Sequence, residues 1–476
     1  MQLPASLIQS LQTIKGFDES AFINIHQSGE QITSIRINPA KQFISTPLDE
    51  MQIHPSTPLR AASIPWSSQG YYLEQRPSFT LDPLFHAGTY YVQEASSMFL
   101  EQAVKQTTDI TQPLLVLDLC AAPGGKSTLL QSIISKESLL VSNEVIQSRL
   151  NILKENLIKW GSSNVLVTNN DPKDFSKLSG LFDVVMIDAP CSGSGLFRRD
   201  AAAINEWSEA NVQLCSQRQQ RIIADAWNCL NEDGVLIYST CSYSTEEDEE
   251  ILDWMMKGLK VEGVRLKVEA AWGIDEVQSS TGAYGYRFWP YKVKGEGFFI
   301  AAFRKKEATD EVRIKIKKES IPSKHEIKLA SAWLNSTDDL SFILQGQNIA
   351  VVPSAWKQTV QYLMQELKVR YAGVEPGTIA KNDLLPEHAL ALSTIVNKEI
   401  FSVELNEEQA LTYLRKNELQ IESSHKGWAL AKYKGMNLGW MKLLGNRINN
   451  YYPKEYRILK AAPSNSPQGG AFHSQP

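Results

Sequence analysis

The sequence predicts a doubly wound α/β domain in the middle of this 476-residue chain. Short apolar strands alternate there with segments whose apolar residues recur at helical spacing, which is typical of a parallel sheet with crossover helices. A glycine-containing turn follows the first strand, and two later strands each end just before a cysteine. Open sheets of this kind bind ligands beyond the carboxyl ends of their strands, so we expect the functional site at this edge.

The expected elements follow in order along the chain. The first strand, 114–119, breaks at the turn CAAPGGK and leads into the helix-compatible stretch STLLQSI. A second strand, LLVSN, ends at Glu144, and the helix after it is expected to stop at Gly161, because glycine commonly ends helices. The remaining elements are a strand at 165–168, the strand DVVMID, a long helix at 203–230 and the strand VLIYS.

The turn after the first strand favours a nucleotide-like ligand. Its glycines let backbone amides at a helix start approach a carboxylate or a phosphate closely. Glu144, after the second strand, is placed to accept hydrogen bonds from ribose hydroxyls, and Asp171, after the third, to meet an adenine amino group. The turn is neither GxGxxG nor a P-loop, since Leu119 stands where a P-loop needs its first glycine. The turn and the two acids together indicate an adenosyl ligand.

Two cysteines each follow an apolar strand: Cys191 in FDVVMIDAPCSGSG and Cys241 in GVLIYSTCSYSTEED. If these strands are neighbours in one parallel sheet, both sulfurs open into the crevice at the carboxyl edge, where one thiol can attack and the other can assist. The alternative is that each is a small buried hydrophobe, which is how we interpret Cys215 and Cys229 in the long helical segment. The acids at 246–250 are expected to form the first turn of a helix, where the macrodipole favours negative charge.

Composition and charge set limits on the class of protein. The chain is 43% hydrophobic and 21% charged, and its net charge of −5 argues against a uniformly basic nucleic-acid binder but allows local patches. The five cysteines lack CxxC spacing and the seven histidines lack HxxxH or HExxH spacing, so we expect neither disulfides nor a metal site. No apolar run is as long as a membrane span, and we recognise no signal peptide.

Basic and aromatic residues interleave in a segment near the C-terminus. Cationic side chains contact phosphates and flat rings stack on bases, so this segment is a candidate RNA surface. A small β-barrel with a solvated outer face would show the same alternation, and the residues alone leave both interpretations open. The set comprises Lys426, Trp428, Lys432, Tyr433, Lys434, Trp440, Lys442, Arg447, Tyr451, Tyr452, Lys454, Tyr456 and Arg457.

The motifs LDLCAAPGGKS, NEV, NNDP, DAPCSGSG and STCSYSTEEDE, in this order and spacing, resemble those of the NOL1/NOP2/Sun family of RNA cytosine-5 methyltransferases, which use S-adenosylmethionine. GTYYVQEASSM and RFWPYKVKGEGFFIAAFRK extend the resemblance over roughly residues 86–306. The block LGWMKLLGNRINNYYPKEYRI, with RYAGVEPGTI before it, is similar to a bacterial subgroup that modifies small-subunit ribosomal RNA and ends in a PUA-like RNA-binding barrel.

The resemblance implies a Rossmann-like S-adenosylmethionine-dependent methyltransferase, α/β in class, with a small α+β N-terminal domain and a C-terminal PUA-like β-barrel. Arg36 in the N-terminal domain is a candidate RNA contact. The expected parts are the N-terminal domain at 1–85, the methyltransferase domain at 86–306, a linker at 307–325, a small α/β module at 326–385, the PUA-like RNA-binding domain at 386–460 and a disordered tail at 461–476.

The resemblance also assigns roles to individual residues. It implies that Cys241 is the nucleophile that adds to carbon 6 of cytosine and that Cys191 assists release of the product. Asp188 would face nitrogen 3 of the base, and Lys126 would supply positive charge beside the base and the thiolate. The expected contacts of the cofactor, S-adenosylmethionine, are Cys120, Ala121, Ala122, Pro123, Gly124, Gly125, Lys126, Glu144, Asp171 and Asp188.

We therefore expect an enzyme that transfers methyl from S-adenosylmethionine to carbon 5 of a specific cytosine in small-subunit (16S) ribosomal RNA, through a covalent cysteine–cytosine intermediate. The same reaction on transfer RNA is the first alternative, because the catalytic motifs do not distinguish the two substrates. A non-catalytic ribosome-assembly factor that binds RNA is the second, and the intact cysteines argue against it. A methyltransferase for an exocyclic amine fits worse, since it needs no pair of thiols. The expected partner is ribosomal RNA or the assembled subunit, and the expected state is a cytoplasmic monomer without membrane contact.

Overall fold

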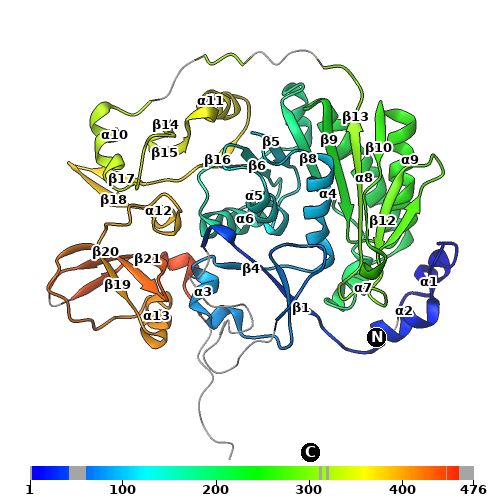
Figure 1. Ribbon diagram of the computed structural model, residues 1–476, viewed down its shortest axis with the longest axis horizontal. Helices are drawn as coiled ribbons and strands as arrows, with labels where there is room; N and C mark the ends of the chain where they lie inside the picture. Colours follow the sequence, from blue (N-terminus) through cyan, green and yellow to red (C-terminus); the bar gives the residue numbers. More distant parts are fainter. Residues whose placement is uncertain (1–2, 42–60, 310–313, 318–320, 446, 460–476) are drawn as a thin grey trace, which may run out of the picture.

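The computed structural model describes residues 3–41, 61–309, 314–317, 321–445 and 447–459. A ten-stranded sheet forms the centre of the molecule (Figure 1). Its strands are β5 (Leu115–Asp118), β6 (Leu139–Asn143), β7 (Val165–Thr168), β8 (Phe182–Asp188), β9 (Leu230–Thr240), β10 (Val261–Val264), β11 (Asp275–Gln278), β12 (Tyr284–Phe288), β13 (Phe298–Lys305) and β16 (Val369–Ala372). Their order is β11-β12-β13-β9-β8-β5-β6-β7-β16, and β10 pairs with β13.

The middle strands of this sheet are parallel. The pairs β5–β6, β5–β8, β6–β7 and β8–β9 are all parallel, whereas β13 and β16 lie antiparallel to β9 and β7. The carboxyl ends of β5 to β9 therefore meet at one edge, as the alternation of strands and helices predicts. The edge strand β16 comes from the segment expected as a small module at 326–385, so that segment completes the central sheet.

Helices cover both faces of the sheet. One face carries α4 (Leu100–Thr107), α5 (Gly125–Ile133) and α6 (Gln147–Trp160), and the other carries α8 (Glu209–Trp227), α9 (Glu249–Gly258) and α11 (Lys357–Glu366). Along β5, Val116 packs with the first group of helices, and Leu115 and Leu117 pack with the second. Because side chains of a strand point alternately to its two faces, both faces are buried, which explains the continuous apolar runs in the sequence.

Most of the expected elements occur at the predicted residues. The strand at 165–168 is β7, and α6 ends at Trp160, where Gly161 follows in the left-handed region with φ of 87°. The helix expected over 203–230 is instead two helices, α7 (Ala202–Glu206) and α8. They are separate because Ser208 caps the second: its side chain accepts a hydrogen bond from the amide of Asn211 (3.1 Å).

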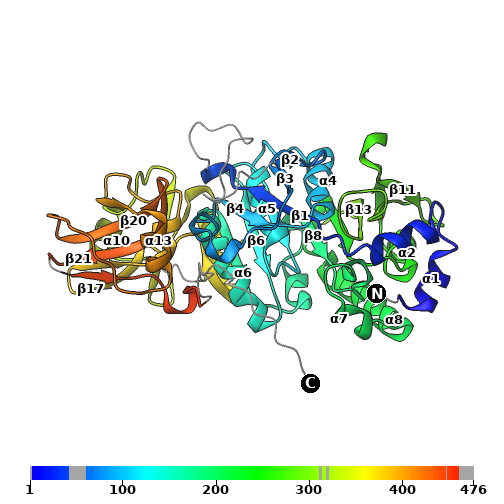
Figure 2. The same ribbon diagram turned by 90° about the horizontal axis from the view of Figure 1, so that it is seen from below.

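The N-terminal segment forms a small α+β unit against the central sheet. Its own sheet has the order β2-β3-β1-β4 with antiparallel pairs, and Figure 2 shows its first two helices at the end of the elongated molecule opposite the C-terminal sheet. The elements are α1 (Ala5–Leu11), α2 (Glu19–Gln27), β1 (Thr33–Ile37), β2 (Ala61–Ser63), β3 (Gly70–Leu73), α3 (Pro83–His86) and β4 (Tyr90–Val92).

Arg36 joins this N-terminal unit to the central domain. The side chain lies on β1 and is 1% exposed. Its guanidinium donates to Gln93 Oε1 (2.9 Å), and to Ser132 Oγ (2.9 Å) and Thr128 Oγ1 (2.6 Å), two residues of α5. The prediction that Arg36 contacts RNA is therefore wrong, because its donors are directed inward at the helix that follows the glycine turn.

The C-terminal part continues from α11 into a separate sheet of order β19-β20-β21-β22. The tail predicted for 461–476 lies outside the described residues, and the boundaries predicted for the domains stay predictions. No helix in the described part of the chain is long and apolar enough to cross a membrane. The elements are α10 (Lys324–Ser331), β14 (Leu340–Gln345), β15 (Asn348–Pro353), β17 (Gly377–Ala380), β18 (Asp383–Pro386), α12 (His388–Leu392), β19 (Ser402–Glu404), α13 (Glu407–Leu414), β20 (Gly427–Tyr433), β21 (Met436–Leu443) and β22 (Ile448–Asn450).

Gly161 offers a test of how the end of α6 is packed. A Cβ atom at this position would lie 2.4 Å from the carbonyl oxygen of Leu392, whereas one at Gly29, which also has a positive φ, would meet nothing within 4 Å. Replacing Gly29 by Ala should cost about 1 kcal/mol of unfolding free energy from backbone strain alone. Gly161→Ala should cost clearly more, and equal losses in urea denaturation would contradict this packing.

Candidate active site

The two cysteine turns lie side by side at the carboxyl edge of the sheet. At the ends of the parallel neighbours β8 and β9, Asp188 is opposite Ser239. Cys191 comes shortly after β8, Cys241 directly follows β9, and their Sγ atoms are 3.0 Å apart. The prediction that the two sulfurs meet at this edge is confirmed. Cys215 and Cys229 are buried, as expected for small hydrophobic packing residues.

Contact with the neighbouring sulfur changes the proton affinity of Cys191. The hydrogen bond to Cys241, burial, and the nearby charge of Glu247 raise the pKa of Cys191 well above that of an ordinary thiol. Either sulfur can be the donor in the contact between them. A thiol in contact with a second sulfur can stabilise negative charge on it by donating a hydrogen bond, so this pair of sulfurs is suited to covalent chemistry.

A partly buried ion pair lies beside the thiols. Lys126 Nζ lies 2.8 Å from Asp188 Oδ2, and Asp188 Oδ1 accepts a hydrogen bond from Ser239 Oγ (2.7 Å). Burial by itself would lower the pKa of Lys126, but the charges of Asp188 and Cys241 outweigh it and raise that pKa. The site thus contains a protonated lysine whose charge interacts with the Cys241 sulfur.

The glycine turn borders the same cavity as these groups. A cavity of about 330 Å³ is lined by Cys120, Ala121, Ala122, Pro123, Gly125, Lys126, Asp188 and Cys241, among others. Gly124 has φ of 112°, and a Cβ atom on Gly125 would lie 3.3 Å from the Tyr91 ring. Asp118, at the base of the turn, is fully buried, and burial raises its pKa to about 7. Its Oδ1 has no hydrogen-bond partner among the described residues, so a ligand donor would satisfy it.

The two acids predicted to hold the adenosyl group lie at neighbouring strand ends, outside the residues that line this cavity. Glu144 follows β6 and is buried, with Oε1 accepting the amide of Ile146 (2.8 Å). Arg149 bridges it to the turn, since one Nη lies 3.5 Å from Glu144 Oε2 and the other donates to the Ala122 carbonyl (2.7 Å). Asp171 caps a 3-10 helix through the amide of Lys173 (3.2 Å). Their roles toward a cofactor stay predictions.

Several lining residues were not predicted from the sequence. Tyr91, Gln93 and Glu94 come from the block GTYYVQEASSM, and Glu296 comes from KGEGFF. Both blocks entered the sequence analysis only as part of the family resemblance, and no residue type in them points to a role by itself. Arg199, in the turn after Cys191, also lines the cavity. Burial raises the pKa of Glu296 to about 7.

The acidic run after Cys241 is only partly the helix start that was predicted. Residues Thr245–Glu247 form a 3-10 helix, η7, and α9 begins at Glu249. Glu247 and Asp248 are fully buried and hydrogen-bonded to the cysteine turns and to β9. The prediction that Glu247 and Asp248 lie in the first turn of the helix is therefore wrong, whereas Glu249 and Glu250 do lie there. Burial with specific donors, rather than the helix dipole, accounts for Glu247 and Asp248.

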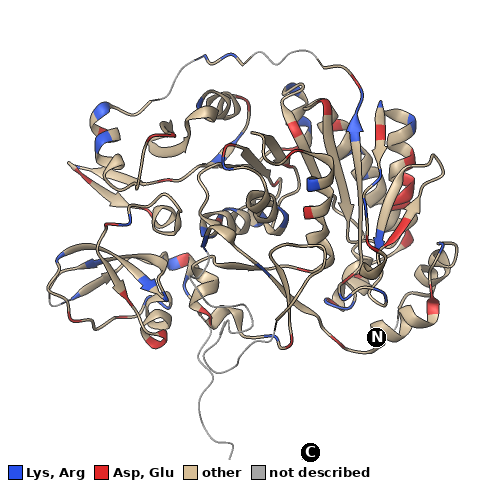
Figure 3. Ribbon diagram, in the orientation of Figure 1, with Lys and Arg blue, Asp and Glu red and all other residues tan. Residues whose placement is uncertain are grey.

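The basic aromatic segment splits into buried and exposed parts. Tyr433, Trp440 and Tyr452 are buried in the C-terminal sheet, which is the alternative that the sequence left open for these rings. Tyr451 is 44% exposed and packs edge-on against Trp428, and Lys442 lies over the Trp428 ring. Figure 3 shows basic residues on this sheet and acidic ones on α13. A stacking surface for RNA is thus reduced to the exposed rings and lysines.

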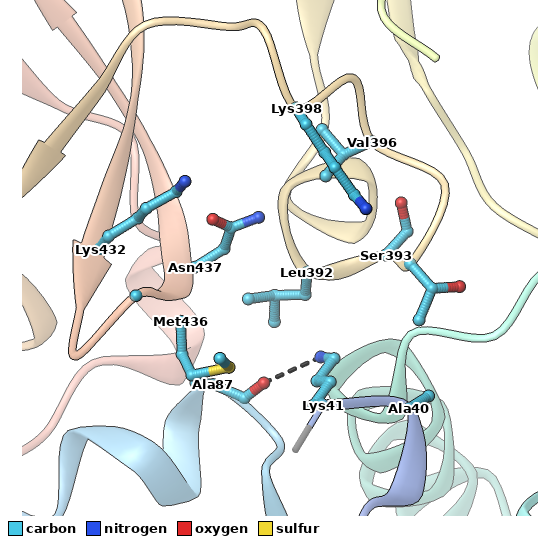
Figure 4. Close-up of a pocket in the computed structure, with 12 residues that line it drawn as sticks. Ala40, Lys41, Ala87, Leu392, Ser393, Val396, Lys398, Lys432, Met436 and Asn437 are labelled. Atoms are coloured by element: carbon cyan, nitrogen blue, oxygen red, sulfur yellow. Dashed lines mark hydrogen bonds between the residues drawn. The ribbon is translucent and has the colours of Figure 1, made fainter. Parts of the chain in front are cut away.

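A second cavity, of about 400 Å³, lies far from the thiols (Figure 4). It is lined by residues of the N-terminal unit, of the loop after α12 and of the β20–β21 turn, and Lys41, Lys398 and Lys432 extend around it. Lys41 Nζ donates to the carbonyl of Lys159 (2.5 Å), near the end of α6. Helix α6 starts near the carboxyl edge of the sheet and rises about 1.5 Å per residue. This cavity, at the other end of α6, is therefore on the order of 20 Å from that edge.

Three family models match the chain. The model described as 16S rRNA methyltransferase RsmB/F matches residues 106–304, that of the N-terminal domain of 16S rRNA methyltransferase RsmF matches 3–95, and that of the methyltransferase RsmF PUA domain matches 401–458. These matches confirm the predicted fold class, a Rossmann-like methyltransferase with an N-terminal domain and a C-terminal PUA-like domain.

Curated relatives match over most of their length. The ribosomal RNA small subunit methyltransferase F of Psychromonas ingrahamii is 30% identical over 412 residues, which cover 83% of this chain and 85% of that protein. The protein of the same name from Vibrio parahaemolyticus is 28% identical over 479 residues and covers 95% of this chain and 97% of its own length.

Two solved structures from Pyrococcus horikoshii share the fold of the catalytic part. A methyltransferase homologue is 27% identical, with a TM-score of 0.50 over 64% of this chain and all of the other. NSun6, solved with SFG, is 18% identical, with a TM-score of 0.54 over 64% of this chain and 98% of its own.

Removing the cation beside the thiols should make Cys241 less reactive. Lys126→Met should slow alkylation of Cys241 by iodoacetamide at pH 7 by about 10-fold, because a nearby positive charge stabilises the thiolate that reacts. The rate is measured by peptide mass spectrometry. Lys136→Met, which removes an exposed lysine in the turn after α5, is the matched control and should react at the wild-type rate. Equal rates in both variants would contradict the proximity of Lys126 to the thiolate.

Proposed function

This chain belongs to the ribosomal RNA small subunit methyltransferase F family, and from that premise we propose that it transfers methyl to carbon 5 of a specific cytosine in small-subunit (16S) ribosomal RNA through a covalent cysteine–cytosine intermediate. The observation that carries the proposal is the contact of two thiols at adjacent strand ends, with a lysine–aspartate pair beside them. Transfer to an exocyclic amine requires no thiol, and a factor that only binds RNA requires none of these groups.

Cytosine carbon 5 needs activation before it can accept a methyl group. In the proposed reaction the Cys241 thiolate forms a bond to carbon 6, and the electrons of the C5–C6 double bond make carbon 5 nucleophilic. Density also flows to nitrogen 3, which takes a proton. An ionised carboxylate can only accept hydrogen bonds, so the Lys126–Asp188 pair supplies that proton from the lysine ammonium, directly or through Asp188.

Release reverses the covalent step. Once carbon 5 carries the methyl group, nitrogen 3 returns its proton to the Lys126–Asp188 pair. The hydrogen on carbon 5 leaves as a proton to water, the C5–C6 double bond re-forms and the bond from carbon 6 to sulfur breaks. The electron pair of that bond returns to Cys241. The proposed part of Cys191 is to donate its thiol proton toward this sulfur, across the 3.0 Å between the two Sγ atoms, and so to stabilise the departing thiolate.

S-adenosylmethionine fits the turn between β5 and α5. A Cβ atom on Gly125 would press against the Tyr91 ring at 3.3 Å, and beneath the turn the buried Asp118 Oδ1 has no hydrogen-bond partner among the described residues. We propose that residues 120–126 hold the cofactor, that Glu144 accepts its ribose hydroxyls and that Asp171 accepts its adenine amino group. When bound, the cofactor supplies the electrophilic methyl group. For Glu144 to accept both hydroxyls, Arg149 must turn away from its carboxylate.

The substrate is proposed to be ribosomal RNA, either free or in the assembled small subunit, bound by a monomer in the cytoplasm. The names of the relatives and the match to a PUA domain of this family support ribosomal over transfer RNA. The exposed ring of Tyr451 and the partly exposed Trp428 and Lys442 beside it provide an aromatic surface and a cation for an RNA strand. The target base must leave its stack to reach the thiols, which favours a loop or weakly paired site.

The two cysteines should give opposite phenotypes. Cys241→Ala should abolish methylation without leaving an adduct, because it blocks entry to the covalent intermediate. Cys191→Ala should still attack and methylate, but it should stall as protein cross-linked to RNA, because only the exit is blocked. Denaturing gels with radiolabelled small-subunit ribosomal RNA and transfer RNA decide both the roles and the substrate, and bisulfite sequencing locates the modified cytosine. An adduct from Cys241→Ala alone would reverse the assignment.

Loss of Glu144 should weaken cofactor binding. Glu144→Ala should reduce the affinity for S-adenosylmethionine by about 1.5–3 kcal/mol, the usual range for hydrogen bonds to a charged group. Glu155→Ala, which removes a carboxylate that pairs with Lys159 on the same helix α6, should bind the cofactor like the wild type. Isothermal titration calorimetry measures both. If Glu144→Ala binds as tightly as Glu155→Ala, the ribose lies elsewhere.

A further inference from the structure

A single buried carboxylate is hydrogen-bonded to both cysteine turns. Glu247, in η7, is fully buried. Its Oε1 accepts the backbone amide of Ser192 (2.8 Å), and its Oε2 accepts the hydroxyls of Ser192 (2.5 Å) and Ser242 (2.6 Å). Ser192 directly follows Cys191, and Ser242 directly follows Cys241. The carboxylate therefore connects the two residues that come right after the two reactive sulfurs.

The carboxylate is itself anchored to the rigid part of the domain. Gln219 of α8 donates to Glu247 Oε1 (3.2 Å) and to the carbonyl of Pro190 (3.1 Å), the residue before Cys191. Tyr238 of β9 donates its hydroxyl to the backbone carbonyl of Glu247 (2.6 Å), and the same oxygen lies 3.0 Å from Gln219 Oε1. The Cys191 turn is thus bonded on either side of the cysteine: Gln219 of α8 binds the carbonyl of Pro190, and Glu247 of η7 binds Ser192.

We propose that Glu247 is a positioning residue for methyl transfer, which ties the turn of Cys191 to the turn of Cys241 and holds the two sulfurs in contact. This inference rests on the proposed function, since it explains how the two thiols act in sequence on one base. Glu247 does not line the cavity that contains the thiols, so it acts through the turns rather than on the base. The side chain at position 247 must be long enough to contact both turns, and it must form four hydrogen bonds.

The donors around Glu247 explain why this position has a carboxylate. Two of the four donors are N–H groups on Oε1, and the other two are serine hydroxyls on Oε2. Hydroxyls can rotate and accept, so a glutamine with its oxygen toward the N–H groups would still satisfy every partner. An aspartate is one methylene shorter and cannot reach both turns. The two substitutions therefore separate shape from charge.

The charge of Glu247 has a secondary effect on the same pair of sulfurs. It adds to the contact with Cys241 and to burial in raising the pKa of Cys191. This charge favours the protonated form of the thiol that is proposed to assist. Since the contact and burial are the larger causes, a neutral glutamine should preserve most of this rise in pKa, provided that the two sulfurs stay together.

The test measures sulfur contact and catalysis separately in Glu247→Gln and Glu247→Asp. Contact is measured as the rate at which diamide, which takes up the two electrons and two protons, forms the Cys191–Cys241 disulfide, mapped by peptide mass spectrometry. Catalysis is measured as kcat and KM on small-subunit ribosomal RNA. Glu250→Gln and Glu250→Asp, at an exposed position of the same acidic run, are the matched controls, and thermal unfolding confirms that each variant is folded.

We expect Glu247→Gln to keep the wild-type oxidation rate and kcat within a few fold, and Glu247→Asp to lose about 10- to 100-fold in both, the loss that small misplacements of reacting groups produce. KM for S-adenosylmethionine should stay unchanged. A Glu247→Asp variant that matches the Glu250 controls in both measurements would overturn the proposal, as would a glutamine variant as impaired as aspartate. If the wild type oxidises readily but methylates no RNA, the proposed function fails while the oxidation rates still decide the positioning.

Discussion

The parallel pairing of β8 with β9 is the constraint on which the site depends. It places Asp188 beside Ser239, so the segments after β8 and β9 leave the sheet at the same level. Cys191 and Cys241 therefore meet although about fifty residues separate them. A shift of one residue in this register would turn every side chain of one strand to the other face, and the sulfurs would no longer face a common crevice. Burial on both faces excludes such a shift, because each face of these strands packs into its own core.

Polar contacts beyond the strand ends complete what the register begins. The amide of Gly195 donates to the carbonyl of Cys241 (2.8 Å), so the first cysteine turn also supports the second. Asp248 binds Thr240 (2.7 Å) and pairs with Arg287, a buried cation that also contacts Glu249 and the carbonyl of Tyr243. Burying a charge costs folding free energy unless the charge is paired. Here Asp248 and Arg287 are paired with each other and are also bonded to the segment that follows β9, near the thiols. The result is a rigid polar support beneath a small reactive surface.

The cofactor side of the site depends on a second contact between distant segments. Tyr91 and Gln93 come from the N-terminal unit, yet they border the turn after β5, and Arg36 fixes that unit to α5 through Thr128 and Ser132. The N-terminal unit thus forms part of the wall of the cavity beside the glycine turn. At the opposite side, β16 closes the sheet next to β7, which joins the segment after the linker to the catalytic domain.

The features that could be predicted from the sequence are those that depend on neighbouring residues in the chain. The strands, the stop at Gly161, the glycine turn and the two cysteine turns depend on short-range patterns, and the sequence by itself determined them and the edge where they meet. The role of Glu247, the burial of Arg36 and the division of the C-terminal rings depend on which segments pack together, which no periodicity encodes. An acid after a turn looks alike in solvent and in a core. Only the tertiary structure decided that Glu247 is buried and bonded. The reason is that donors from α8 and from both cysteine turns, far apart in the sequence, converge on that one carboxylate.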